Sequence, residues 1–388
     1  MQATSVKSLF LFVLGILLFG LSVCPVHAGF TSLYIFGDTV SATTNNAGLF
    51  PSGTNFFGRR YINGRVWAEV LAQEQGLTNN YWYSTNRSFP VFYTNLTSLT
   101  TNWFYSSNNC SYYADDSVEL VKNVAAFSAP PGTTNALFII WVNNADFVDA
   151  LPNNATNIVF WSNSINQFLT NHFKAVTNLY AKGARTLIMP NAVDISAAPA
   201  FRHYLAATNG FLRLRVIDFN AAFTTTLMNR IKTSCPNITI YVPDFFTLLD
   251  NILTNAAAYG LTNAGIDVLH DSSLTNLSMT GPGANYIWWD DEDPTAKAQA
   301  VMADVVQQLI SPVQITNLTV FNGSNQLDAA NLPIGLNGFV DGSTNLVLAN
   351  WVAHTNFSSI TTTHAVFVPA SGPLWFYRLR FPYTWSWP

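Results

Sequence analysis

The chain has 388 residues, of which 49% are hydrophobic and only 10% are charged, and its formal net charge is −4. This length and apolar content suit one large domain with a small one, or two medium domains, each with a buried core. The weak negative charge and the lack of any block of basic residues argue against a nucleic-acid partner.

The first residues of the chain are typical of a secretory signal peptide. Lys7 precedes an apolar run at residues 9–21, and residues 26–28 fit a small-residue cleavage site. The run is shorter than the about 20 residues that a membrane-spanning helix needs, so we expect cleavage before Gly29 rather than a membrane anchor. The sequence therefore predicts a protein that is secreted, periplasmic or held at the cell surface.

Strand-like and helix-like segments then alternate as far as about residue 311. Short apolar runs predict strands at residues 33–36, 137–141, 186–189 and 238–242. Apolar residues at helical spacing predict helices at residues 65–75, 165–182, 211–231 and 295–309. Continuous apolar strands separated by helices indicate an α/β fold with a parallel sheet covered on both faces. The site of such a sheet lies at the carboxyl ends of its strands.

The stretch from Tyr81 to Tyr113 has neither a helical nor a strand period. It is interpreted as a long irregular insertion near the site, or alternatively as an ordinary surface loop. Cys110 lies in it, and Cys235 is the other cysteine that remains after removal of the signal peptide. An oxidising compartment would allow these two to pair, and the sequence leaves that open.

The sequence pattern changes after Pro312. Alternating segments at residues 314–321, 345–353 and 365–369 are separated by Gly and Asn turns, which predicts a small all-β module, a sandwich. The tail at residues 373–380 resembles the last strand of short C-terminal β-modules of secreted bacterial proteins. That resemblance implies contact with a cell surface or a polymer, and the alternative is an edge strand that only completes the module.

Five sequence blocks, in order, resemble the GDSL/SGNH hydrolases. The blocks are Phe36–Thr39, Arg60–Trp67, Phe138–Phe147, Gly183–Asn191 and Trp289–Thr295. They are similar to the Phe-Gly-Asp-Ser, Arg-Tyr-Ser-Asn-Gly-Arg-Val-Trp, strand plus Gly-x-Asn-Asp-Phe, next strand and loop, and Trp-Asp-x-x-His-Pro-Thr blocks of that family. The resemblance implies a flavodoxin-like three-layer SGNH fold and the hydrolysis of ester bonds. With it, the chain divides into a signal peptide (1–28), an SGNH hydrolase-like domain (29–311) and a β-rich module (312–388).

The residues for which the family is named are replaced. The resemblance places Thr39 at the nucleophilic Ser, and Ser107 and Ala145 at the oxyanion-hole Gly and Asn. Asp290 matches the catalytic Asp, and Asp293 stands at the His. The adjoining Asp38, Asn143 and Asn144 are expected in the same site, and the resemblance implies no metal and no cofactor.

Acyl transfer needs an activated hydroxyl, a base and donors aimed at the oxyanion. Thr39 keeps a hydroxyl beside an extra methyl group, Ala145 has no side-chain donor, and a carboxyl group such as Asp293 is a weaker base than imidazole. Like-charge repulsion from Asp290 would raise the pKa of Asp293 and improve it as a base.

Two further groups each allow a functional and a purely structural interpretation. His270 could replace the missing histidine, or it is a solvated loop residue. The acidic run Asp290–Asp293 could hold a metal, or it caps the helix that follows, where negative charge is favourable.

Three functions therefore stay open. The chain is an ester hydrolase with altered residues, a secreted pseudoenzyme that binds a glycan, a lipid or an acylated polymer, or a purely structural surface protein. Its expected ligand is a small ester, lipid or acylated glycan.

Overall fold

A computed structural model describes residues 30–43, 56, 60–75, 77, 109–154, 156–263, 265–275, 277, 281–321, 323–334, 337–345, 351–369 and 375–381. The predicted signal peptide, Ser107 and most of the insertion at 81–113 lie outside these residues. Within them, no helix combines the length and the apolar character needed to cross a membrane.

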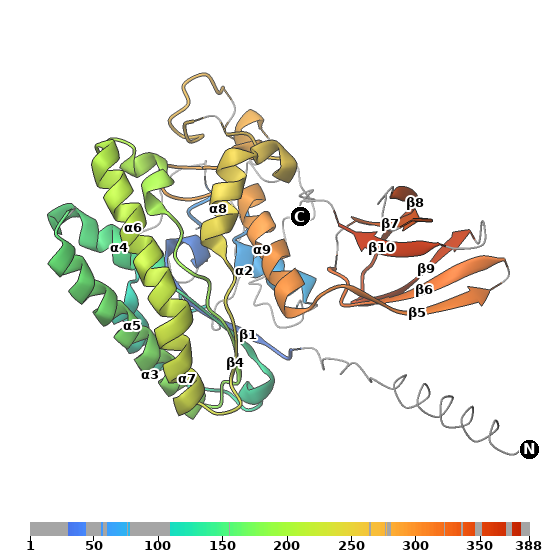
Figure 1. Cartoon of the computed structure of the whole chain (residues 1–388), viewed down its shortest axis with the longest axis horizontal. Helices are drawn as coiled ribbons and strands as arrows, with labels where there is room; N and C mark the ends of the chain where they lie inside the picture. Colours follow the sequence, from blue (N-terminus) through green and yellow to red (C-terminus); the bar gives the residue numbers. More distant parts are fainter. Residues whose placement is uncertain are drawn as a thin grey trace, which may run out of the picture.

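A parallel sheet of four strands forms the centre of the large domain (Figure 1). Its order is β1 (Leu33–Gly37), β2 (Leu137–Trp141), β3 (Thr186–Ile188) and β4 (Thr239–Tyr241). All residues of β1 and β2 are buried, which explains why their sequences are continuously apolar.

The free edge of β1 is covered by the segment that begins at Asn109. Asn109 forms a parallel bridge with Ile35, and the Cys110 N–H donates to the Ile35 carbonyl at 2.8 Å. The chain thus places a segment on one side of β1 and then crosses to β2 on the other side. This reversal makes the carboxyl ends of β1 and β2 a topological switch point, where α/β proteins place their sites.

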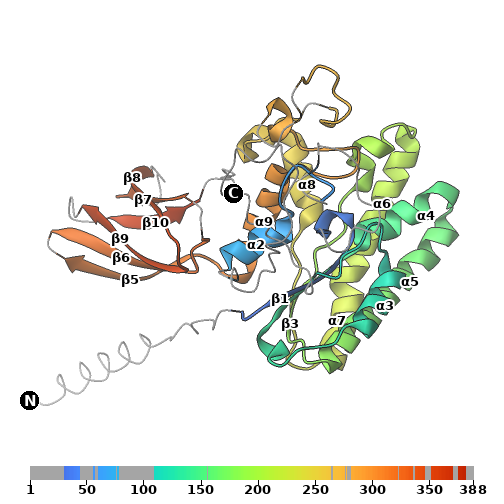
Figure 2. The same ribbon diagram turned by 180° about the vertical axis from the view of Figure 1, so that it is seen from behind.

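Helices cover both faces of the sheet, and the two views in Figures 1 and 2 agree on this. One layer contains α5 (Ile158–Ala181), which contacts both α3 (Ser117–Ala126) and α7 (Met228–Ser234). The other contains α2 (Trp67–Glu74) and α9 (Ala296–Ile310), which pack together. The three-layer α/β fold predicted from the sequence is confirmed.

The predicted strands and helices of this domain all exist, with shifted ends. The helix expected at 165–182 begins earlier, at Ile158, and the one expected at 211–231 is α6 (Ala206–Ala222) followed by a π-helical turn and α7. The sequence analysis missed three helices, namely α3, α4 (Asn143–Asn154) and α8 (Phe245–Thr254).

The C-terminal region consists of two antiparallel three-stranded sheets. One has the order β5 (Gln314–Phe321), β6 (Ser324–Ala330) and β9 (Thr363–Pro369); the other has β10 (Phe376–Arg380), β7 (Asn337–Ser343) and β8 (Val352–Ser358). Residues from both sheets, Leu327, Val340, Val366 and Val368, form their common buried core. The all-β module is confirmed, although the strand expected at 345–353 begins only at Val352. The exact division at residue 312 stays a prediction.

Candidate active site

The carboxyl end of β1 positions the residue that stands where the family has its nucleophile. Thr39 opens a single 3₁₀ turn, η1 (Thr39–Ser41), and the Asp38 carboxylate caps that turn by accepting from the Val40 N–H at 3.1 Å. Gly37 precedes it in a tight space, because a Cβ there would lie 2.9 Å from Ser111 Oγ and from Ser41 Cβ. The glycine therefore allows the segment beside β1 to approach closely.

The carboxyl end of β2 runs directly into α4, so that the Asn-Asn-Ala-Asp block is the first helical turn. The Asn143 side chain donates to the Pro190 carbonyl at 2.8 Å, and Asn144 Oδ1 accepts from the Val193 N–H at 3.1 Å. Both amides thus join β2 to the loop after β3. Ala145 lies next to them without a side-chain donor.

The acidic turn before α9 places a third group. The Asp290 carboxylate accepts from the backbone N–H groups of Glu292 at 3.0 Å and Asp293 at 2.6 Å. Asp290 therefore shapes the turn, and Asp293 is held at its end. Within the described residues, no group of acidic, His or Cys side chains is arranged to hold a metal ion.

A pocket of about 220 Å³ brings most of these residues together. Thr39, Asp293, Ala145, Asp38 and Asn144 line it, whereas Asp290 and Asn143 do not. Ser107 lies outside the described residues, so its predicted position is untested. The roles assigned to the other residues from the resemblance stay predictions, although their neighbourhood is now defined. The rest of the wall is mainly apolar and includes Val148, Ile195, Phe201, Leu248, Leu249, Ile252 and Met302.

The Thr39 hydroxyl has a backbone partner and no base. Thr39 Oγ1 accepts from the Ala114 N–H at 3.2 Å, and no hydrogen bond joins it to Asp293 or Asp290 in the described structure. Ala114 has a left-handed backbone conformation with φ 54°, which is uncommon for an alanine. Sequence reasoning missed Ala114 and its neighbour Tyr113 as pocket residues, because nothing in an alanine signals such a conformation.

Burial raises the pKa values of the carboxyl groups in and beside the pocket. It raises the pKa of Asp293 well above its usual value, and the charges of Asp290 and Asp38 raise it further. Burial also raises the pKa of Asp38 to about 7, against the opposing hydrogen bonds from the backbone of Val40 and Ala145. The pKa of Asp290 rises to about 7, again mainly through burial. Burial and the neighbouring charges thus favour the protonated form of Asp293, and a protonated carboxyl group cannot accept the proton of Thr39.

The same burial predicts a pH dependence of stability. Because the folded chain holds the proton of Asp38 up to about pH 7 while the unfolded chain releases it near pH 4, stability is lost as the pH rises through this window. Between pH 4 and pH 8, the free energy of unfolding of the variant Asp38→Asn is therefore expected to fall by about 4 kcal/mol less than that of the native chain. Urea unfolding across this range measures it, and parallel curves for the two proteins would show that Asp38 ionises in the fold near its usual pKa.

Neither His270 nor His172 lies at the described pocket as a base. His270 is paired with the buried Asp267 at 2.8 Å and has a side chain that is 64% exposed; it does not line the pocket. His172 is fully buried in α5, and burial lowers its pKa to about 4. The interpretation of His270 as a solvated loop residue fits its position.

A buried framework holds the pieces of the site together. Trp67, at the start of α2, donates from Nε1 to Ser41 Oγ at 3.0 Å and from its backbone to Gln299 Oε1 of α9 at 2.8 Å. Asn63 accepts from the Ala296 N–H at 2.8 Å. The block at 60–67 thereby joins η1 to the first turn of α9, which follows Asp293.

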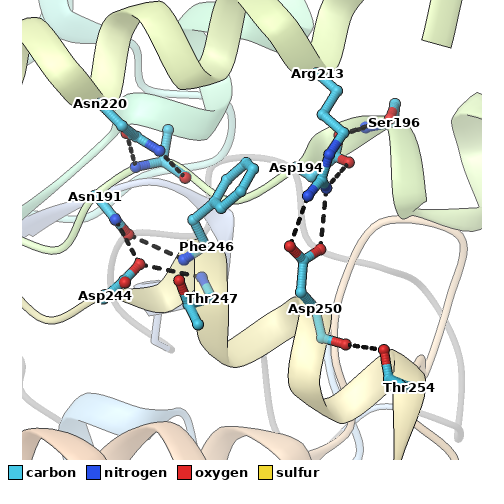
Figure 3. Close-up of polar contacts among 11 residues, drawn as sticks. Asn191, Asp194, Ser196, Arg213, Asn220, Asp244, Phe246, Thr247, Asp250 and Thr254 are labelled. Carbon is cyan, nitrogen blue, oxygen red and sulfur yellow. Dashed lines mark hydrogen bonds and ion pairs between the residues drawn. The ribbon is translucent and has the colours of Figure 1, made fainter. Parts of the chain in front are cut away.

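A polar network fixes the apolar wall of the pocket (Figure 3). Arg213 of α6 donates to Asp194 at 2.6 Å and to both carboxylate oxygens of Asp250 on α8, at 3.0 and 2.6 Å. Asn191 donates to Asp244, the N-cap of α8, at 2.8 Å and accepts from the Phe246 N–H at 3.0 Å. These bonds hold α8, which contributes four apolar side chains to the pocket, against the loop after β3.

Comparison with known proteins bears on the family to which the chain is similar. No protein-family model matches the chain. A GDSL esterase/lipase of Arabidopsis thaliana is 24% identical over 335 residues, covering 75% of this chain and 86% of the relative, and a second one is 22% identical over 306 residues, covering 70% and 87%. Acetylajmalan esterase 2 of Rauvolfia serpentina is 27% identical over 369 residues, covering 78% and 94%. Among solved structures, an acetyl-xylooligosaccharide esterase from Geobacillus superposes over 72% of this chain and 94% of that one, at 10% identity and a TM-score of 0.38, too low a score to bear on the fold. The sequence relatives at 22–27% identity are GDSL esterases/lipases and an acetylajmalan esterase, and together with the five ordered blocks they support a relationship of this chain to the GDSL/SGNH hydrolases.

Proposed function

We propose that the chain is a non-catalytic member of this family, which binds a small ester, lipid or acylated glycan in the pocket without efficient hydrolysis. The observation that supports it best is the environment of Asp293. This group occupies the histidine position, is 4% exposed, and has a raised pKa because it is buried beside other carboxyl groups. Among the described residues, no base is hydrogen-bonded to the Thr39 hydroxyl, and an apolar pocket surrounds it.

Binding can be measured through the tryptophans of the pocket, Trp141 and Trp288. Methyl hexanoate is expected to change the tryptophan fluorescence of the mature chain saturably. In the variant Ala198→Phe, whose larger side chain fills the pocket, this response should disappear while the circular dichroism spectrum stays native. A response that survives in Ala198→Phe would place the binding elsewhere.

The second candidate is slow ester hydrolysis, which the shared location of Thr39 and Asp293 in one pocket favours. Short-chain nitrophenyl esters distinguish the two. The non-catalytic function predicts no turnover above the buffer rate, in the native chain and in Thr39→Ala alike. Turnover that is lost in Thr39→Ala would establish the second candidate instead.

The location of the protein is part of the proposal. The basis is the N-terminal sequence, which predicts export and cleavage before Gly29. N-terminal sequencing of the exported protein tests it, since an uncleaved N-terminus would contradict it. The β-module is proposed to contact a surface or polymer, on the basis of its resemblance to modules of secreted proteins.

A further inference from the structure

The described part of the pocket has an unusual balance of charge. Four carboxyl side chains line it, those of Asp38, Asp149, Glu292 and Asp293. None of the described lining residues is Lys, Arg or His. In the described part of the wall, an anionic ligand such as a carboxylate or a phosphate would therefore meet like charges and no counter-charge.

Asp293 is the group whose hydrogen bonding is incomplete. Its side chain is 4% exposed, yet among the described residues its carboxyl oxygens make no hydrogen bond; only its backbone N–H and carbonyl do. Carboxyl groups in protein interiors nearly always have a partner, and the small exposure that the Asp293 side chain keeps is toward the pocket. The open space of the pocket is where such a partner can bind.

Aromatic rings line the same space. Tyr113, Trp141, Phe201, Phe245 and Trp288 all contribute to the wall. The faces of aromatic rings attract cations, and rings combined with carboxylates are the arrangement that proteins use to bind organic ammonium groups. The apolar residues of α8 suit a hydrocarbon body attached to such a group.

We infer that the ligand of this pocket is an organic cation, an ammonium group on an apolar body, with Asp293 as its principal partner. This inference rests on the proposed binding function and adds a cationic group to the apolar ligand proposed there. An ammonium group would donate to the Asp293 carboxylate and relieve the repulsion between Asp293, Asp38 and Asp290. A neutral ester of the same shape would gain only the apolar contacts.

Cation binding and deprotonation of the carboxyl groups are coupled. The titratable and charged groups around Asp293 come from every side: Asp38 after β1, Tyr61 before α2, Tyr113 and Asp115 beside β1, Asp149 on α4, and Asp290, Asp291 and Glu292 in its own turn. All are acids, so a bound cation lowers their pKa values and releases protons. Affinity for an ammonium ligand is therefore expected to rise between pH 6 and 8, whereas affinity for a neutral ligand stays constant.

The test compares three ligands of one shape, hexylammonium, 1-hexanol and hexanoate, by calorimetry on the mature chain at pH 8. Hexylammonium is expected to bind at least about tenfold more tightly than hexanol, and hexanoate more weakly than either. In Asp293→Asn, which keeps the shape of the side chain, the preference for hexylammonium should disappear while hexanol still binds. Asp291→Asn removes a carboxylate from the same turn outside the pocket and should leave the preference intact.

The outcomes separate the two proposals. Equal binding of hexylammonium and hexanol, or a preference for hexylammonium that is unchanged in Asp293→Asn, would overturn the inference of a cationic ligand. The proposed binding function of the pocket would still hold. Failure of all three ligands, together with failure of methyl hexanoate, overturns the binding function itself.

Discussion

The variant Thr39→Ser/Ala145→Asn/Asp293→His is expected to hydrolyse short-chain nitrophenyl esters at least about 10³-fold faster than the native chain. One oxyanion donor contributes about 10²–10³ in rate, and a positioned general base about 10²–10⁴. The three positions already line one pocket. The Ala114 N–H already points at the hydroxyl of residue 39, so the substitutions add groups to a formed site.

Stepwise variants make this expectation specific. Asp293→His alone should give little activity, because groups that act as a unit are strongly non-additive. Replacing residue 39 by Ala in the triple variant should return the rate to that of the native chain. An inactive triple variant with a native circular dichroism spectrum would mean that the spacing of the pocket, and not only its residues, departs from a working hydrolase.

The second large effect is expected from Glu69→Ala, through stability. Arg60 and Glu69 form a bidentate ion pair, with Nε to Oε2 at 2.7 Å and a second bond from Nη2 to Oε1, and both side chains are fully buried. Glu69 also accepts from the Val66 N–H at 3.0 Å. Removing one member leaves a buried charge behind, which costs about 3–5 kcal/mol. Urea unfolding at neutral pH measures the loss.

A double variant provides the control. Arg60→Met/Glu69→Leu removes both charges and keeps apolar volume, so it should be clearly more stable than Glu69→Ala. If the two variants were equally destabilised, the pair would matter through packing and not through its charges.

The sheet could be predicted because its strands are buried on both sides. β1 and β2 are continuously apolar, and their predicted positions agree with the structure to within one residue. Helix α4 was missed because its first turn is read as a polar loop: Asn143, Asn144 and Asp146 are buried, and their partners lie on other segments of the chain. A pattern of polarity alone cannot show that such residues are satisfied at a distance.

Only part of the candidate site could be predicted, because some of its residues are brought together by contacts that are distant in the sequence. Thr39 and Ala145 follow the carboxyl ends of β1 and β2, and Asp293 precedes α9; these element ends were recognisable in the sequence. The approach of Ala114 depends on a backbone conformation that alanine rarely adopts, and the apolar wall depends on α8, held by the network around Arg213. The raised pKa of Asp293 depends first on burial, and then on the charges of its sequence neighbours Asp290, Asp291 and Glu292 and of the distant Asp38; the sequence shows only the neighbours.

The framework formed by Arg60, Asn63, Trp67 and Glu69 is separate from the pocket in this chain. Its bonds to η1 and α9 come from Trp67 and Asn63, and its charges neutralise each other within the pair Arg60–Glu69. None of these residues lines the pocket. A combinatorial library at positions 39, 114, 145 and 293 would therefore vary the chemistry of the pocket while these framework bonds stay in place. A sequence search based on the framework residues would identify related proteins without indicating whether they are active.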